Sequence, residues 1–81
     1  MPTIHQEDGF DFIIYPNDHP PAHIHVCKAE GEAIVILGDG EEGPYVRDNF
    51  NMKKKNEKKA LRITERKNED FWEEWEKYHG N

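Results

Sequence analysis

The distribution of glycine and proline constrains this fold more than any other feature of the sequence. Residues 51–79 contain neither, whereas residues 1–45 hold all five prolines and five of the six glycines. Residues 1–45 are thereby divided into short runs that suit strands. The later stretch has apolar side chains with a helical period, namely Ala60, Leu61, Ile63, Phe71, Trp72, Trp75 and Tyr78. The chain therefore predicts several strands followed by a C-terminal helix.

The first 37 residues have the alternation and turn chemistry of an antiparallel meander. Four strands are expected there, at residues 3–6, 10–15, 23–28 and 33–37. Asp8-Gly9 is a strong hairpin signal, because a type I′ turn needs a positive φ at both central residues. Gly31 can supply a positive φ for a second hairpin. Tyr45 and Val46 allow one further, brief strand.

The remainder of the chain is expected to be a loop and a helix. Residues 38–44 combine three glycines, one proline and three acids. Packing such a segment loses much conformational entropy, so we expect a disordered or mobile acidic loop. One long helix is expected at about residues 56–79, because lysines 53–55 would oppose the helix dipole. Asn68, followed by two acids, resembles an N-cap, so the helix can bend there.

The fold prediction is an α+β domain, with a four-stranded antiparallel β-meander packed against one long C-terminal α-helix. Large apolar residues on one face of the second strand and on the helix should form the core. These residues are Phe10, Phe12, Ile14, Phe71, Trp75 and Tyr78. Trp72 is expected to be partly exposed.

Length and composition bound the class of protein. A chain of 81 residues is expected to form a single domain over residues 1–81. The lone cysteine, Cys27, excludes an internal disulfide, and no apolar run is long enough for a membrane span. We therefore expect a cytoplasmic protein without a membrane partner, either monomeric or weakly self-associating.

The net charge of −6 is unevenly distributed. Residues 1–45 carry nine acids and one lysine, a net charge of −8, while residues 46–81 carry ten bases and eight acids, a net charge of +2. Four bases with helical spacing form a stripe that would suit the phosphates of RNA, namely Lys55, Lys59, Arg62 and Arg66. A charged stripe on a helix is more often its solvated face.

Candidate chemistry concentrates in residues 17–26, where three of the five histidines lie beside Asp18 and two prolines. Pro20-Pro21 has no backbone donors and should form a rigid, extended entry to the third strand. Successive side chains of a strand alternate between its faces, which places His23 and His25 together on the face opposite the core.

Three interpretations of this block stay open. In the first, His23 and His25 bind a divalent transition metal such as zinc, either His19 or Asp18 is the third ligand, and Cys27 can be a fourth. His23 and His25 with Asp18 can instead form a metal-free, ribonuclease-like catalytic group that divides general base and general acid work. In the third interpretation, Asp18 accepts hydrogen bonds from backbone amides and imidazoles in a purely structural lock.

Motifs along nearly the whole chain resemble DUF4160, a family of small bacterial domains of unknown function. The family opens with Met-Pro-x-Ile and passes through a Gly-aromatic strand into Asp-His-x-Pro-Pro-His-x-His-Val. It ends in a helix with a tryptophan near Tyr-x-Gly. The matching segments here are Met1–Ile4, Gly9–Phe12, Asp18–Val26 and Trp75–Gly80. The chain departs from the pattern at Ala22, where the family has its second proline.

The resemblance implies a function in outline only. Such proteins are often encoded beside a second small domain of unknown function, DUF2442, in an arrangement that looks like a toxin–antitoxin pair. We therefore expect a component of such a module, with a DUF2442-like partner, that acts on or binds RNA through the histidine cluster. The alternative is a non-catalytic module that binds a partner or a metal. No reaction is established for the family, so the resemblance assigns no catalytic residue.

Overall fold

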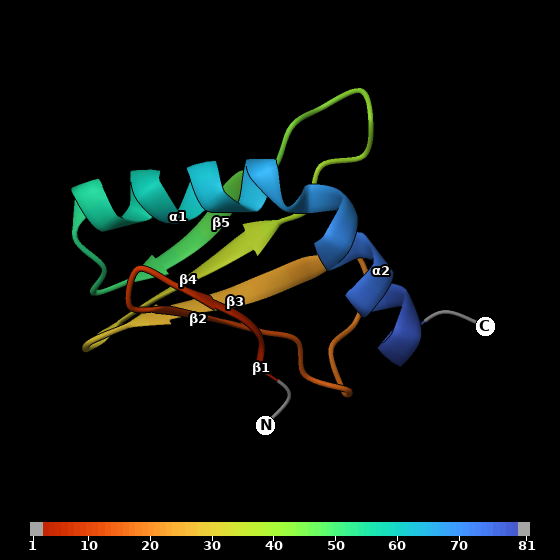
Figure 1. The fold of residues 1–81 in the computed structure, drawn as a ribbon, viewed down its shortest axis with the longest axis horizontal. Coiled ribbons are helices and arrows are strands. Elements are labelled where there is room, and N and C mark those ends of the chain that lie inside the picture. The colour runs from red at the N-terminus through yellow and green to blue at the C-terminus, as the bar shows by residue number, and fades with distance from the viewer. Residues whose placement is uncertain (1–2, 80–81) are drawn as a thin grey trace.

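The computed structural model describes residues 3–79, so the Met1-Pro2 and Gly80 parts of the family-like motifs lie outside the described residues. The elements in this range are β1 (Thr3–Glu7), β2 (Phe10–Ile13), β3 (His23–Lys28), β4 (Gly31–Ile36), β5 (Tyr45–Phe50), α1 (Lys54–Arg66) and α2 (Asn68–His79). The strands form one antiparallel sheet in sequence order, and α1 lies over one of its faces (Figure 1). The α+β meander is confirmed.

The described sheet has five strands, so the prediction of four is wrong. β5 pairs with β4 from Glu32 opposite Phe50 to Ile36 opposite Tyr45. The centre of β5 is polar, which is why the sequence indicated only a brief strand. An edge strand tolerates such residues, because one of its sides has no neighbouring strand and meets water.

The first hairpin closes as predicted, and the second closes differently. Asp8 and Gly9 have φ values of 54° and 83°, as a type I′ turn requires. In the second hairpin the positive φ, also 54°, belongs to Ala29 rather than Gly31. Gly31 starts β4 and is needed for space, because a Cβ there would lie 2.7 Å from the Cα of Met52.

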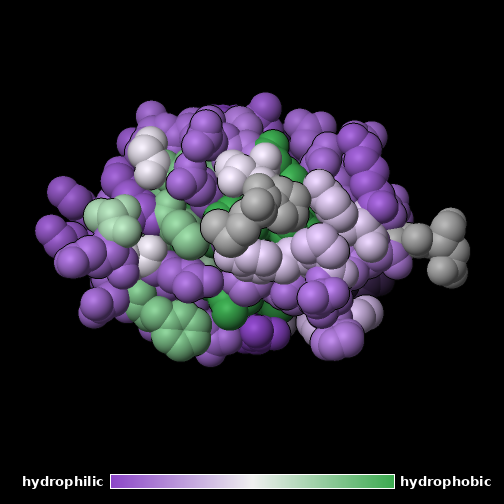
Figure 2. All heavy atoms as spheres, turned by 90° about the horizontal axis from the view of Figure 1, so that it is seen from below, coloured by the Kyte–Doolittle hydropathy of each residue, from purple (hydrophilic) through white to green (hydrophobic). Residues whose placement is uncertain are grey.

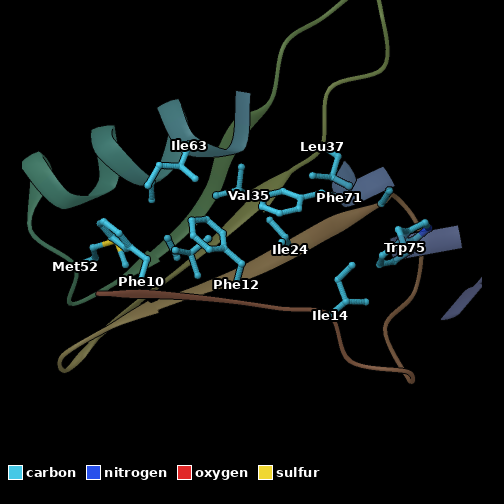
Figure 3. Close-up of a cluster of buried hydrophobic side chains, with 14 residues drawn as sticks. Phe10, Phe12, Ile14, Ile24, Val35, Leu37, Met52, Ile63, Phe71 and Trp75 are labelled. Atoms are coloured by element: carbon cyan, nitrogen blue, oxygen red, sulfur yellow. The ribbon is translucent and has the colours of Figure 1, made fainter. Parts of the chain in front are cut away.

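The core fills the space between the sheet and the two helices (Figure 3). Phe10, Phe12 and Ile14 are fully buried, as predicted. Phe71 of α2 packs on Phe12, with ring centroids 5.3 Å apart, and Trp75 is also buried. The sheet face predicted from alternation is therefore the face that carries the core.

The predicted single helix is two helices that meet at Lys67. α1 starts at Lys54, earlier than predicted, and its N-cap residue Lys53 makes no side-chain capping bond. Lys67 leaves helical geometry, with φ −103° and ψ 13°, and α2 begins at the next residue. α2 then turns away from α1 and runs past the end of the sheet (Figure 1). Tyr78 is therefore 40% exposed rather than in the core, whereas Trp72 is half-buried as predicted.

The acidic loop, residues 38–44, is hydrogen-bonded to α2 at its first residue, Gly38, and the disorder or mobility that its composition indicated stays a prediction. The Asn68 side chain accepts a hydrogen bond from Gly38 N–H at 2.9 Å and donates one to the Gly38 carbonyl at 3.0 Å. Trp72 Nε1 donates to the same carbonyl. Inside the loop, the Asp39 carboxylate accepts two backbone N–H bonds. Composition alone does not reveal these partners.

The other sheet face is turned away from α1. Figure 2 views the molecule from that side and shows hydrophobic atoms scattered among polar ones. Tyr45 and Phe50, at the two ends of β5, are the most exposed large hydrophobic residues in the described chain, at 51% and 55%. This is also the face on which β3 presents His23 and His25.

Candidate functional site

Asp18, His23 and His25 come together beside the start of β3. The Nε2 atoms of both histidines lie 3.3 Å from the same atom, Asp18 Oδ2. The three side chains offer ligand atoms that all lie within 4.8 Å of one another. His23 is almost completely buried, while Asp18 and His25 are half-buried. The structure thus gathers the three residues that the sequence proposed as a catalytic group.

A tight turn brings Asp18 to the strand. Asp18 N–H donates to the Tyr15 carbonyl at 3.0 Å, and Tyr15 N–H donates to Asp18 Oδ2 at 3.2 Å. This pair of bonds closes the chain between β2 and β3 into a compact turn with the carboxylate directed inward. Asp18 Oδ2 therefore already accepts one backbone hydrogen bond before any imidazole is considered.

The opposite nitrogen of each imidazole is bound to an oxygen. His23 Nδ1 lies 2.9 Å from the Pro21 carbonyl oxygen, and His25 Nδ1 lies 3.0 Å from Glu32 Oε2. A carbonyl and an ionised carboxylate can only accept, so each Nδ1 must donate. In a neutral ring, Nε2 then carries a lone pair. Among the described residues, the buried His25 Nε2 has no hydrogen-bond partner.

Two of the three separations among the ligand atoms match those of a metal site. Two ligand atoms that are each about 2.1 Å from a tetrahedral zinc ion stand about 3.4 Å apart. The two separations between Nε2 and the carboxylate oxygen are 3.3 Å. Metal-binding histidines also commonly donate their second N–H to a carbonyl or a carboxylate, as both rings do here.

Comparison with known proteins identifies the family and leaves the chemistry open. Residues 9–76 match the family described as Domain of unknown function (DUF4160). The chain belongs to the DUF4160 family. No curated protein and no solved structure matches the chain. In the part of this DUF4160 domain that the structure describes, no helix is both long and apolar enough to cross a membrane.

The surroundings of the site in this DUF4160 domain are rich in negative charge. Burial raises the pKa of the Tyr15 phenol, and Cys27, Glu32 and Asp18 raise it further. Tyr15 packs edge-on against His25, with ring centroids 4.7 Å apart. Two carboxylates beside two imidazoles favour a cation at the centre of the group.

Two predicted ligands are not part of the group. His19 is exposed, and the cluster found among the described residues does not include it. The turn that directs Asp18 inward leaves the following residue on its outer side. Cys27 is also absent from the cluster. Burial raises the pKa of its thiol, the negative charge of Glu32 raises it further, and the thiol therefore favours its protonated form.

Two further residues complete the site and were not predicted. Glu32 reaches His25 from β4, where it lies opposite Cys27 and therefore diagonal to His25 on the same face. The length of the turn between β3 and β4 sets this register, so it is the feature of the sequence from which the contact could have been predicted. Trp75 of α2 packs against His23, with ring centroids 5.3 Å apart, and no local pattern indicated that contact.

The predicted basic stripe is partly neutralised. Lys59 Nζ lies 3.4 Å from an Asp8 carboxylate oxygen, and Arg66 pairs with Glu7. Both acids belong to the first hairpin, which packs beside α1. The stripe also lies on the α1 side of the sheet, whereas His23 and His25 project from the other face. The structure therefore does not place the stripe and the histidines around one site.

Proposed function

We propose that this DUF4160 domain binds a divalent transition metal ion through Asp18, His23 and His25. The observation that carries the proposal is the approach of both Nε2 atoms to Asp18 Oδ2 while each Nδ1 is already engaged. With neutral imidazoles, lone pairs and an anionic oxygen face one another, and this arrangement is repulsive unless a cation lies among them. A metal ion would supply that cation.

The donor set narrows the choice of metal. Two imidazoles and one carboxylate suit zinc and also iron(II), nickel or copper, whereas magnesium and calcium prefer oxygen donors. Three protein ligands leave at least one coordination position for water or another ligand. A bound ion of this kind can act as a Lewis acid or lower the pKa of a bound water to about 7. We assign no reaction to it.

Two other interpretations differ in measurable ways. In the metal-free acid–base interpretation and in the structural lock, protons on the imidazoles take the place of the metal. Neither requires bound metal, so neither predicts a response to chelation. The RNA-acting role in a toxin–antitoxin-like module, with a DUF2442-like partner, stays a prediction that rests on the family resemblance.

Metal titration of protein purified without a histidine tag tests the proposal. We expect one zinc ion per chain by competition with a chromophoric chelator. Zinc at 100 times its Kd adds about 2.7 kcal/mol of stability, which corresponds to a rise in Tm of roughly 10–20 °C for a domain of this size. Asp18→Ala and His25→Ala should abolish binding. His19→Ala is the matched control and should bind zinc like the wild type.

Two results would contradict the proposal. One is wild-type protein that holds less than about a tenth of a metal equivalent and shows no change in Tm with zinc or with chelator. The other is loss of binding in His19→Ala to the same extent as in His25→Ala. Circular dichroism of each variant shows whether it has folded, and the wild-type titration decides the question even if a variant has not.

A further inference from the structure

A groove between α1 and the tip of the β3–β4 hairpin gathers positive charge in an otherwise acidic protein. Its volume is about 450 Å³, and it is lined by Lys28, Lys53, Lys55, Asn56, Lys59 and Arg62. Five of these six side chains are cationic, whereas the whole chain has a net charge of −6. We propose that this groove binds the phosphate backbone of a nucleic-acid duplex without reading its sequence.

The position of Lys28 distinguishes this groove from the solvated face of a single charged helix. It comes from β3 and meets the cations of α1 across the groove. Its Nζ donates to the Asp8 carbonyl at 3.0 Å and lies 4.6 Å from the centroid of the Phe10 ring. These contacts hold its side chain in place. Cations from two separate elements therefore face a common space.

The acids nearby leave most of this charge available. The Asp8 carboxylate lies 3.4 Å from Lys59 Nζ, but both side chains are about half exposed. Exposed pairs of this kind contribute little and are readily replaced by another anion. The first turn of α1 contains one acid, Glu57, which accepts a hydrogen bond from Asn49. The start of α1 adds the positive end of its dipole to the side-chain charges.

The lining of the groove favours a nucleic-acid backbone over other polyanions. An interface with an acidic protein would be expected to have apolar or aromatic residues at its centre, and none of the residues lining this groove is apolar or aromatic. A single-stranded nucleic acid usually stacks its bases on aromatic side chains, which are likewise absent from this lining. Lysine and arginine contacts to phosphates suit the backbone of a duplex and carry no sequence information.

This binding is separate from the proposed metal site. Lys28 contacts Phe10 on the core side of the sheet, whereas His25 projects from the opposite face. Along β3, the two residues are also roughly 10 Å apart at their Cα atoms. A duplex in the groove would therefore bind in the presence or absence of metal.

Fluorescence anisotropy with labelled duplexes of mixed sequence tests the proposal at low salt. The duplexes are RNA and DNA of about 20 base pairs. Comparing them shows whether the phosphate backbone that they share is sufficient for binding. The groove variant is Lys53→Gln, Lys55→Gln, Lys59→Gln and Arg62→Gln. The control variant is Arg47→Gln, Lys54→Gln, Lys58→Gln and Lys77→Gln, which makes the same change in net charge outside the lining of the groove.

We expect wild-type binding to both duplexes that weakens about a hundredfold between 50 and 200 mM salt, as about four neutralised phosphates imply. The groove variant should bind at least about tenfold more weakly. Its plot of log affinity against log salt should be shallower by about one unit for each phosphate that the protein no longer neutralises. The affinity of the control variant should fall less than about threefold. Chelator and the His25→Ala substitution should leave binding unchanged.

Several outcomes would overturn the proposal. The first is that the folded wild type binds neither duplex, and the second is that the groove variant and the control variant lose affinity equally. The third is that single strands bind more tightly than duplexes. The fourth is that polyglutamate displaces the duplex completely. Polyglutamate competition would point instead to an acidic protein partner. Because the metal titration uses no nucleic acid, failure of the groove proposal and failure of the metal proposal are independent results.

Discussion

Truncation of Glu32 tests whether the histidines are arranged for a metal. Glu32 Oε2 lies 3.0 Å from His25 Nδ1 and fixes the ring with Nε2 facing Asp18. The Glu32 side chain is 40% exposed, so Glu32→Ala opens no cavity in the core. Without this acceptor, His25 is free to rotate or to change tautomer. Loss of such an outer hydrogen-bond partner typically weakens metal binding 10–100-fold, or about 1.4–2.7 kcal/mol.

A graded series separates the hydrogen bond from the charge. Glu32→Gln retains an oxygen acceptor for His25 but removes the negative charge, so its zinc affinity should fall between those of the wild type and Glu32→Ala. Glu30→Ala is the control, because Glu30 is an exposed residue in the turn of the same hairpin. It removes the same charge without touching His25, and we expect wild-type affinity.

The assay is zinc competition at pH 7.5, together with the Tm of the metal-free proteins. Because Glu32 is substantially exposed, metal-free Glu32→Ala should melt close to the wild type, and its defect should appear in zinc affinity. Wild-type affinity in Glu32→Ala would refute the proposed orienting role of Glu32, as would an equal loss of affinity in Glu30→Ala. Complete loss of binding would instead identify Glu32 as a direct ligand.

Two further predictions concern contacts outside the site. Asn68→Ala removes two hydrogen bonds to Gly38 and should destabilise the domain by about 1–3 kcal/mol, measured as a lower midpoint in urea unfolding; an unchanged midpoint would show that these two hydrogen bonds do not stabilise the fold. The Arg66 guanidinium, and after it the hydrogen bond from His5, lower the pKa of the Glu7 carboxyl from 4.5 to about 2. Because this folded-state pKa is below the unfolded one, ionised Glu7 contributes stability above about pH 4.5 that is lost as the pH falls towards 2. In an NMR titration, Arg66→Ala should return the midpoint of Glu7 towards 4.5, and an unaltered midpoint would exclude the ion pair as the cause.

Interactions between near neighbours in the sequence were predictable. Asp8-Gly9 closes a hairpin because its backbone preference is local, and the bounds of β3 follow from the alternation that begins after the proline pair. The same alternation placed His23 and His25 on one face, and the turn at Asp18 brought the carboxylate to them. These parts of the candidate site depend on residues within a span of eight positions.

Contacts between distant elements were not predictable in the same way. The inclusion of Glu32 in the site depends on the register in which β3 and β4 pair. A shift of register by one residue would turn Glu32 to the other face of the sheet. Helical spacing showed that Lys59 and Arg66 share a side of α1 but could not show that the acids of the first hairpin face them.

The sequence by itself determined that a β-meander precedes a helical C-terminal part, which face of the sheet is buried and in which residues chemistry concentrates. Periodicity, turn preference and charge act over a few residues, so they can be read along the chain. Tertiary structure decided that β5 joins the sheet, that the helix divides at Lys67 and that Lys28 completes a basic groove. Each of these depends on which surfaces pack together, because partners tens of residues apart in sequence supply hydrogen bonds, charge and apolar contact only after the chain has folded.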